Sequence, residues 1–466
     1  MSSLRQRLFG TPAPDTPIRV AAATSATTPA TDTPMPVAPP IQEAYLRLKS
    51  GLHMQLLERM DLGALEALGD ASLRREIARL VEQLLTENPA PINEAERRQL
   101  VRDIQHEMLG LGPLELLMAD PQVSDILVNS HDQIYVEREG RLVLTTVSFT
   151  DDTHLMRIID KIVSRVGRRI DESSPMVDAR LPDGSRVNAI IPPIALDGPM
   201  LSIRRFAAIP LRMKDLLEVR KSLSPPMAVL LGALSRSRTN MLISGGTGSG
   251  KTTLLNILSG YIPASERIIT IEDAAELPLQ QPHVVRLETR PPNTEGRGEI
   301  NQCALVRNAL RMRPDRIVIG EVRGAEAIDM LQAMNTGHEG SLTTIHANNP
   351  RDALARLESM VSLAGVNMPL RTLRQQIASA LSVVIQVSRL PDGQRKVMSI
   401  QEISGMEGEV ISLQELFRFQ QTGVDGGDGV LGHFEATGVR PGFADRLRRQ
   451  GLALPDDLFD PAPRYP

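Results

Sequence analysis

The chain of 466 residues is poor in aromatic side chains, and this scarcity argues against one class of function. Aromatic residues make up 3% of the sequence, tryptophan is absent, and the formal net charge is −4. Motors that move nucleic acid combine a basic channel with aromatic residues on which bases stack. We therefore expect no nucleic-acid partner, although a local basic loop is compatible with this composition.

Cysteine is equally scarce, since Cys303 is the only one. One thiol cannot form an internal disulfide or a zinc site made of several cysteines. The sequence therefore predicts no zinc and suits a reducing compartment.

Long apolar runs are also missing from the sequence. No run approaches the roughly 20 residues of a membrane-spanning helix, and Met1 to Pro12 hold no apolar stretch of signal-peptide length. We expect a cytoplasmic protein that reaches a membrane only through partners.

The first 110 residues divide into two parts. Residues 1–40 are rich in Pro, Thr and Ala, which predicts a disordered leader because such a segment buries too little apolar surface. Residues 41–110 contain three stretches with apolar residues at helical spacing, which predict a small helical module. Those stretches are Tyr45–Met60, Ile77–Leu85 and Leu100–Met108.

The remaining sequence predicts an α/β protein with two further domains. Short strand patterns and one helical pattern between residues 111 and 207 predict an α+β domain, which we class as PAS-like. A linker over residues 208–215 contains Ile209-Pro210. Strands alternate with helices over residues 216–445, which predicts a mainly parallel, RecA-like sheet. We expect the chain after Gln420 to pack loosely, with Phe417, Phe419 and Phe434 as residues that could anchor parts of it. Residues 446–466 are predicted to be a C-terminal tail.

The strongest motif runs from Met241 to Thr253 and has the pattern of a phosphate-binding P-loop between a strand and a helix. Backbone N–H groups of such a loop form an anion cradle. Lys251 is expected to reach the β- and γ-phosphates of ATP, and the Thr252 hydroxyl to bind Mg²⁺. The predicted nucleotide-binding residues are Gly245, Gly246, Thr247, Gly248, Ser249, Gly250, Lys251, Thr252 and Thr253.

Three later segments place polar residues at the carboxyl ends of predicted strands, where open α/β sheets bind ligands. Glu272, Asp273 and Glu276 follow one strand, and Glu321 follows another. His346 ends a further strand, and His338 lies shortly before that strand. Carboxylates at this edge can hold Mg²⁺ and orient water, and a histidine can donate a hydrogen bond to a phosphate.

Together these segments resemble those of the type II/type IV secretion ATPases. Glu272 to Glu276 is similar to the aspartate box of that family, Gly320-Glu321 to its Walker B element, and His338 to His346 to its histidine box. The resemblance covers about residues 95–445. Within the family it favours the CpaF-like ATPases of tight-adherence (Tad) pili. The stretches that favour this branch are Ser124–Asn129, Val177–Asn188 and Leu310–Ile317.

The resemblance implies a role for several of these residues. Glu276 matches the glutamate that polarises the attacking water, and Glu321 matches the carboxylate that acts on Mg²⁺ through water. His346 and His338 match histidines that sense the γ-phosphate. Arg180 and Arg186 match arginines that the preceding domain brings to the nucleotide, with Arg204 and Arg205 as a weaker pair; the residues alone also fit surface arginines. Related ATPases often carry a four-cysteine zinc element, which Cys303 alone cannot supply.

The resemblance also implies a homo-hexameric motor at the inner face of the inner membrane, which powers pilus assembly through membrane platform proteins. A type IV secretion export ATPase is the main alternative. A nucleic-acid motor and a regulatory nucleotide-binding module are further alternatives. The sequence leaves the direction of pilus movement open.

Overall fold

A computed structural model of the chain describes residues 40–59, 70–138, 140–205, 211–290, 292, 297–365, 368–426 and 429–465. The predicted leader lies outside these residues except for Pro40, where the first helix begins. The described residues fall into two compact units. One contains residues 40–59 and 79–91, and the other contains residues 70–78 and the described residues from 92 onward. No helix within the described ranges is long and apolar enough to cross a membrane.

Three helices lie where three helical patterns were predicted: α1 (Pro40–Arg59), α3 (Asp70–Glu87) and α4 (Glu94–Leu109). Their apolar stripes are buried, as Leu56 in α1 and Ile77 in α3 show. A capping box begins α4, because Asn93 accepts the N–H of Glu96 and Glu96 accepts the N–H of Asn93.

The second unit contains a six-stranded antiparallel sheet in the order β3-β2-β1-β6-β5-β4. Side chains of alternating residues, such as Ile126 and Val128 in β1, are buried on one face. The helix α6 (Asp152–Arg165) contributes its apolar residues to the same core. This region is an α+β fold, as the sequence predicted. Its strands are β1 (Val123–Val128), β2 (Ile134–Arg138), β3 (Arg141–Leu144), β4 (Met176–Arg180), β5 (Arg186–Ile190) and β6 (Met200–Arg204), and α5 (Glu115–Ala119) precedes them.

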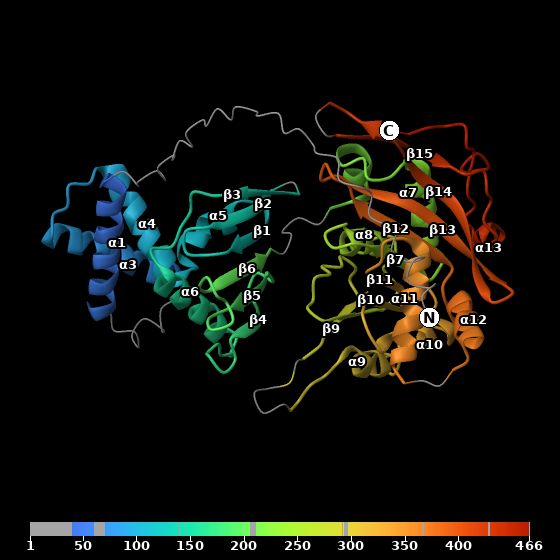
Figure 1. Cartoon of the computed structure of the whole chain (residues 1–466), viewed down its shortest axis with the longest axis horizontal. Coiled ribbons are helices and arrows are strands. Elements are labelled where there is room, and N and C mark those ends of the chain that lie inside the picture. Colours follow the sequence, from blue (N-terminus) through green and yellow to red (C-terminus); the bar gives the residue numbers. More distant parts are fainter. Residues whose placement is uncertain are drawn as a thin grey trace, which may run out of the picture. The chain divides into compact units, whose positions relative to one another are not determined.

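A nine-stranded sheet follows in the same unit, in the order β15-β14-β13-β12-β7-β11-β10-β8-β9 (Figure 1). The six strands from β12 to β9 in this order are parallel, and β12, β13, β14 and β15 pair antiparallel. The strands are β7 (Met241–Gly245), β8 (Ile268–Glu272), β9 (Val284–Glu288), β10 (Arg316–Val322), β11 (Leu342–Ile345), β12 (Val383–Arg389), β13 (Arg395–Glu407), β14 (Val410–Val424) and β15 (Val430–Ala436).

Helices cover both faces of the parallel strands, so the strands are apolar throughout. In β7, Met241 and Ile243 belong to one core and Leu242 to the other. The first core includes α7 (Pro225–Arg236) and α8 (Lys251–Ser259). The second includes α9 (Gln302–Ala309), α10 (Glu326–Asn335), α11 (Pro350–Leu363) and α12 (Leu370–Ala380).

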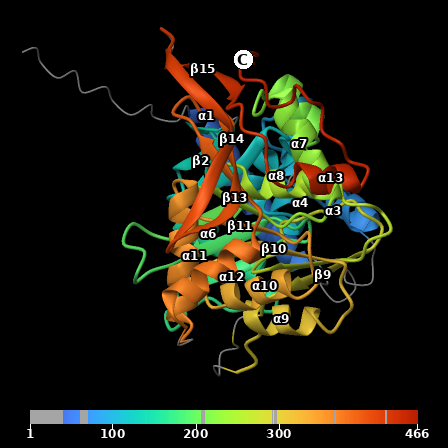
Figure 2. The same ribbon diagram turned by 90° about the vertical axis from the view of Figure 1, so that its right-hand side faces the viewer.

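The prediction that the chain packs loosely after Gln420 is wrong, whereas the expected anchoring by Phe417, Phe419 and Phe434 agrees with their burial in the first core. Strand β14 continues to Val424 and pairs with β15, and α13 (Ala444–Arg449) follows (Figure 1, Figure 2). Phe434 and Leu447 are fully buried in the first core, which also includes Leu458 and Phe459. The apolar residues are widely spaced among Gly, Asp and Pro, so no local periodicity reveals that each fills a place in a distant core.

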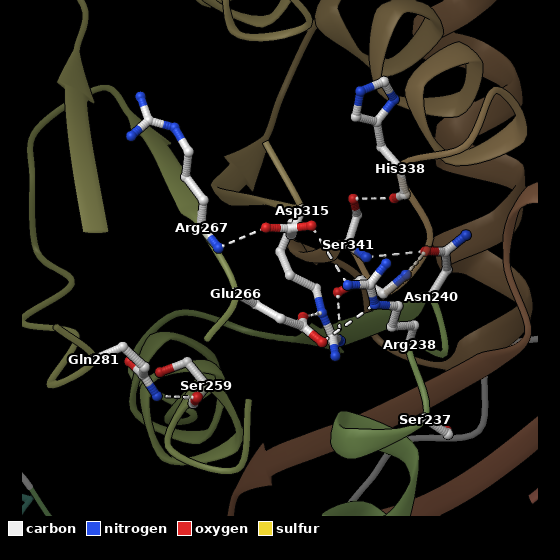
Figure 3. Close-up of polar contacts among 12 residues, drawn as sticks. Ser237, Arg238, Asn240, Ser259, Glu266, Arg267, Gln281, Asp315, His338 and Ser341 are labelled. Carbon is white, nitrogen blue, oxygen red and sulfur yellow. Dashed lines mark hydrogen bonds and ion pairs between the residues drawn. The ribbon is translucent and has the colours of Figure 1, made fainter. Parts of the chain in front are cut away.

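A network of ion pairs joins the amino ends of the parallel strands (Figure 3). Arg316 is fully buried and its Nε donates to the Glu266 carboxylate, which Arg238 also contacts at 3.2 Å. The side-chain oxygen of Asn240 accepts the backbone N–H groups of Gly340 and Ser341. These contacts join residues at the amino ends of β7, β8, β10 and β11, and removing one partner of the buried pair would leave an uncompensated charge.

We expect Phe434→Ala to lower the free energy of unfolding by about 3–5 kcal/mol, because it leaves a cavity in the first core. Urea denaturation followed by circular dichroism measures this change. Val424→Ala, at a half-exposed position of β14, is the matched control and should change stability by less than about 0.5 kcal/mol. Equal stability of the Phe434 variant and wild type would contradict the ordered packing of the C-terminal segment.

Candidate functional site

The predicted phosphate loop lies between β7 and α8, at the carboxyl end of the parallel strands. Gly248 and Gly250 have φ angles of +68° and +94°, which residues with a Cβ rarely adopt. A Cβ on Gly245 would lie 2.4 Å from the Val387 carbonyl oxygen, so the neighbouring strand β12 also requires glycine there. The Nζ of Lys251 donates to the Gly246 carbonyl at 2.8 Å and thereby lies across the loop.

The residues of this loop fit a nucleotide polyphosphate. Residues Thr247 to Thr253 all line one cavity of about 710 Å³, and the amino end of α8 begins there at Lys251. Burial lowers the pKa of Lys251. Loop N–H groups, a helix terminus and a lysine are the donors that bind phosphates, and the Thr252 hydroxyl and Glu321 carboxylate supply oxygen atoms suited to Mg²⁺.

The structure brings three of the residues predicted from other strands to this cavity. Glu276, Glu321 and His346 all line it. Glu321 lies in β10 and His346 directly follows β11, and β11 lies between β7 and β10 in the sheet. Since the carboxyl ends of parallel strands meet at one edge, residues far apart in the sequence gather around the loop.

The structure does not bring His338 to this chain's own phosphate loop. His338 precedes β11 and therefore lies at the amino end of the strand, at the edge opposite the loop. Its carbonyl oxygen accepts the Ser341 hydroxyl at 2.8 Å, and Figure 3 shows its ring turned away from the ion-pair network. The ring Nδ1 is buried and has no hydrogen-bond partner among the described residues.

The two arginines predicted from the α+β domain have different positions. Arg186 lines the cavity, and its Nη1 lies 2.8 Å from Glu276 Oε1. Arg180 does not line this cavity; it pairs with Glu288 at 2.9 Å and donates to the Ala275 carbonyl. Arg186 is thus the arginine that meets a predicted catalytic carboxylate, whereas Arg180 contacts the segment beside it.

Arg204, the last residue of β6, and Arg205, which follows the strand, also have different contacts. Arg204 lines the cavity and its Nε lies 3.2 Å from Asp125 Oδ1. Arg205 donates to the carbonyl oxygens of Asp120 and Val123, which places it in the local structure of the α+β domain.

Glu272 has a structural role that its sequence position did not reveal. Its Oε2 accepts the backbone N–H groups of Glu276, at 2.6 Å, and Leu277, at 3.0 Å. Its Oε1 is buried without a hydrogen-bond partner among the described residues. Burial raises the pKa of the Glu272 carboxyl to about 7. Glu272 therefore anchors the segment that carries Glu276 to the end of β8.

Sequence reasoning missed other residues of the site. Arg323 contacts Glu321 at 2.8 Å and Asp273 at 3.6 Å, and so joins the Walker B element to the acidic segment. Its position two residues after Glu321 was a usable signal. Glu137 and Arg395 also line the cavity, but they lie 258 residues apart and no motif marks either of them.

Comparisons with known proteins show which family this chain resembles. The model of the family described as "Type II/IV secretion system protein" matches residues 107–425. A putative conjugal transfer protein of Mycobacterium tuberculosis is 39% identical over 318 residues, which are 66% of this chain and 89% of that protein. The type IV secretion system protein VirB11 of Bartonella henselae is 32% identical, over 62% of this chain and 91% of that protein.

Among solved structures, the VirB11 ATPase from the Brucella suis type IV secretion system, in complex with sulphate, is 29% identical. The match covers 62% of this chain and 95% of that chain, with a TM-score of 0.34.

We expect the Glu272 carboxyl to make the free energy of unfolding of wild type decrease as the pH rises. The folded state binds the Glu272 proton more tightly than the unfolded chain, so this contribution is fully present below pH 4.5 and is lost as pH rises through about 7. In Glu272→Gln this part of the pH dependence should vanish, a difference of about 3 kcal/mol at 1.36 kcal/mol per pK unit.

Urea denaturation from pH 4.5 to pH 8 measures this difference. Glu218→Gln, at an exposed position, is the control and should follow wild type. Parallel stability curves for wild type and Glu272→Gln would show that the Glu272 carboxyl has an ordinary pKa.

Proposed function

Because the chain belongs to the type II/IV secretion system protein family, we propose that it is an ATP-hydrolysing motor of a secretion or pilus machine. The observation that carries this proposal is the cavity in which the phosphate loop meets Glu276, Glu321, His346 and Arg186. Simple nucleotide binding does not need a carboxylate that orients water. The presence of two carboxylates beside the loop therefore favours hydrolysis over a regulatory binding module.

The topology supports a RecA-like motor domain. Strand β7, which leads into the loop, is separated from the Walker B strand β10 by β11, so His346 lies between the phosphates and Glu321 in the order of strands. We propose that the preceding antiparallel sheet is the PAS-like domain of this motor. We also propose that six copies of the chain form a ring.

Six residues of the cavity then have distinct roles in the proposed reaction. Lys251 and the loop N–H groups bind the phosphates, and Thr252 and Glu321 would hold Mg²⁺, the latter through water. Glu276 accepts a proton from the attacking water, and Arg186 orients the Glu276 carboxylate by its 2.8 Å contact. His346 donates a hydrogen bond to the γ-phosphate. Bound Mg²⁺ supplies neutralisation of the phosphate charge.

The cavity also suggests how hydrolysis becomes movement. Residues of the antiparallel sheet, including Arg186 and Arg204, and residues of the parallel sheet line the same space. Binding and release of nucleotide would close and open this space, and the motion would act on a membrane platform protein. Association with a membrane would then come only through such partners, at the inner face of the inner membrane.

For the machine itself we propose a Tad pilus of the CpaF-like type. The sequence stretches Ser124–Asn129 and Val177–Asn188 support this branch. The relative from Mycobacterium tuberculosis carries the name of a conjugal transfer protein, which favours the alternative of a type IV secretion export ATPase. The two proposals share the same chemistry and differ in what the motor moves.

We expect purified protein to hydrolyse ATP in the presence of Mg²⁺, and Lys251→Ala to lose nucleotide binding. Glu276→Gln should bind ATP but lower kcat by about 10²–10⁴-fold, because it removes the base and keeps the shape of the side chain. A coupled ATPase assay and calorimetric binding measure these effects, and mass photometry with ATP and Mg²⁺ tests the six-subunit ring.

His338→Ala is the matched control, since His338 lies at the opposite edge of the sheet, and kcat should remain within twofold of wild type, or about 0.4 kcal/mol. Equal turnover by wild type and Glu276→Gln would contradict the assigned role of Glu276.

We expect cells that carry only the Lys251→Ala chain to lose surface pili and to keep conjugal DNA transfer, if the machine is a Tad pilus. Electron microscopy of the cell surface and mating assays, both compared with wild type and with restored wild-type gene, measure the two outcomes. Loss of DNA transfer with normal piliation would exclude the Tad assignment and favour the export ATPase.

A further inference from the structure

The hairpin of β12 and β13 lies beside the phosphate loop because of strand pairing. Strand β12 pairs in parallel with β7, and Val387 is the register partner of Gly245, the first residue of the loop. Arg389 ends β12 and Arg395 begins β13, and the two are register partners of each other. The turn end of the hairpin therefore presents two neighbouring arginines at the phosphate loop, although no motif of the phosphate-binding site includes them.

Both arginines lie against the loop backbone. The Nε of Arg395 donates to the Gly248 carbonyl oxygen at 2.8 Å. A Cβ on Gly250 would lie 3.5 Å from Arg395 Cδ, and a Cβ on Gly248 would lie 3.6 Å from Arg389 Nη1. Glycine at these two positions thus leaves room for the arginine side chains. It also allows the positive φ angles of the loop.

A carboxylate from the antiparallel sheet contacts the same two arginines. Glu137 in β2 accepts from Arg395 Nη2 at 3.3 Å, and its other oxygen lies 3.8 Å from Arg389 Nη1. Charge-assisted hydrogen bonds between arginine and carboxylate are shorter, at about 2.7–2.9 Å, so both contacts are long. The Glu137 carboxylate is therefore shared between two arginines at long distances. The loop beside them is suited to binding negative phosphate oxygens.

We propose that Arg389 and Arg395 form an anion site beside the phosphate loop, for which Glu137 and the polyphosphate of a bound nucleotide compete. This inference rests on the proposed function, because it assigns two further nucleotide-binding residues to the same phosphate loop. Arg395 lines the cavity, and Arg389 lies beside the loop at Gly248. A polyphosphate carries more negative charge than one carboxylate, so it displaces Glu137 from the arginines.

The competition links the nucleotide to the α+β domain. Glu137 belongs to β2, and β2 is hydrogen-bonded to β1 in the antiparallel sheet. When the arginines turn to phosphate, the contact between β2 and the hairpin weakens. In one state the arginines bind Glu137, and in the other they bind the nucleotide. Because the nucleotide interacts differently with these two states, its binding shifts the equilibrium between them.

Calorimetric binding of ADP to the full chain tests the proposal with four variants. We expect Arg395→Gln to weaken ADP binding about tenfold, and Glu137→Gln to strengthen it about fivefold, as removal of a competing ion pair of about 1 kcal/mol implies. In the Arg395→Gln background, Glu137→Gln should change the affinity for ADP less than twofold. Arg395, the main partner of Glu137, is then already absent, so no competing ion pair is removed. Glu288→Gln is the matched control. Glu288 of β9 also pairs with an arginine across the two sheets, Arg180 of β4, but this pair does not line the cavity of the phosphate loop.

Hydrogen exchange supplies a second readout that does not depend on turnover. Addition of ADP should raise amide exchange in β2 of wild type, and this rise should be absent in Glu137→Gln, where the contact is already broken.

An unchanged affinity in Glu137→Gln, or an equal gain in Glu288→Gln, would overturn the proposal; the second result would assign the gain to general loosening between the two sheets. Failure of the proposed function gives a different result, in which wild type and Lys251→Ala bind ADP equally poorly.

Discussion

Parallel pairing of β7 with both β11 and β12 is the constraint on which the rest of the site depends. It places the phosphate loop between the ends of two other strands. On one side, His346 follows β11 and Glu321 lies in β10 beyond it. On the other side, β12 brings Val387 so close that position 245 must be glycine, and the hairpin that follows brings Arg389 and Arg395. The local sequence therefore supplies the anion-binding groups of the loop, and strand pairing in the sheet brings the other residues of the site beside it.

Opposite charges are paired throughout this cavity, which is how it keeps many ionised groups together. Arg186 meets Glu276, Arg323 meets Glu321, and Arg204 meets Asp125. These side chains are partly exposed, so each pair adds little to stability. Their value lies in orientation, since the first two pairs fix Glu276 and Glu321, which the proposed reaction needs. The Glu272 carboxyl serves the same end by a different means, because it is buried and holds the backbone of Glu276.

The opposite edge of the sheet carries a network of buried polar contacts. Arg316 is fully buried against Glu266, and Asn240 holds the backbone of Gly340 and Ser341. A Cβ on Gly340 would lie 2.3 Å from Arg316 Nη1, so this glycine is needed for close packing. Backbone pairing along β7, β11 and β10 then carries the chain to the carboxyl ends at the other edge. Catalysis and architecture are thus separated along the same strands.

The local sequence by itself determined the phosphate loop, the alternation of strands and helices, and the acidic and histidine residues that follow strands. Glycine spacing, apolar periodicity and strand ends are short-range properties that a sequence displays directly. Only the tertiary structure decided which residues meet across long separations. It placed Arg186 on Glu276 and Arg180 elsewhere, sent His338 to the far edge, and buried Phe434 and Leu447 in the core. Strand order and register fix such contacts, and neither is encoded in any single segment of the chain.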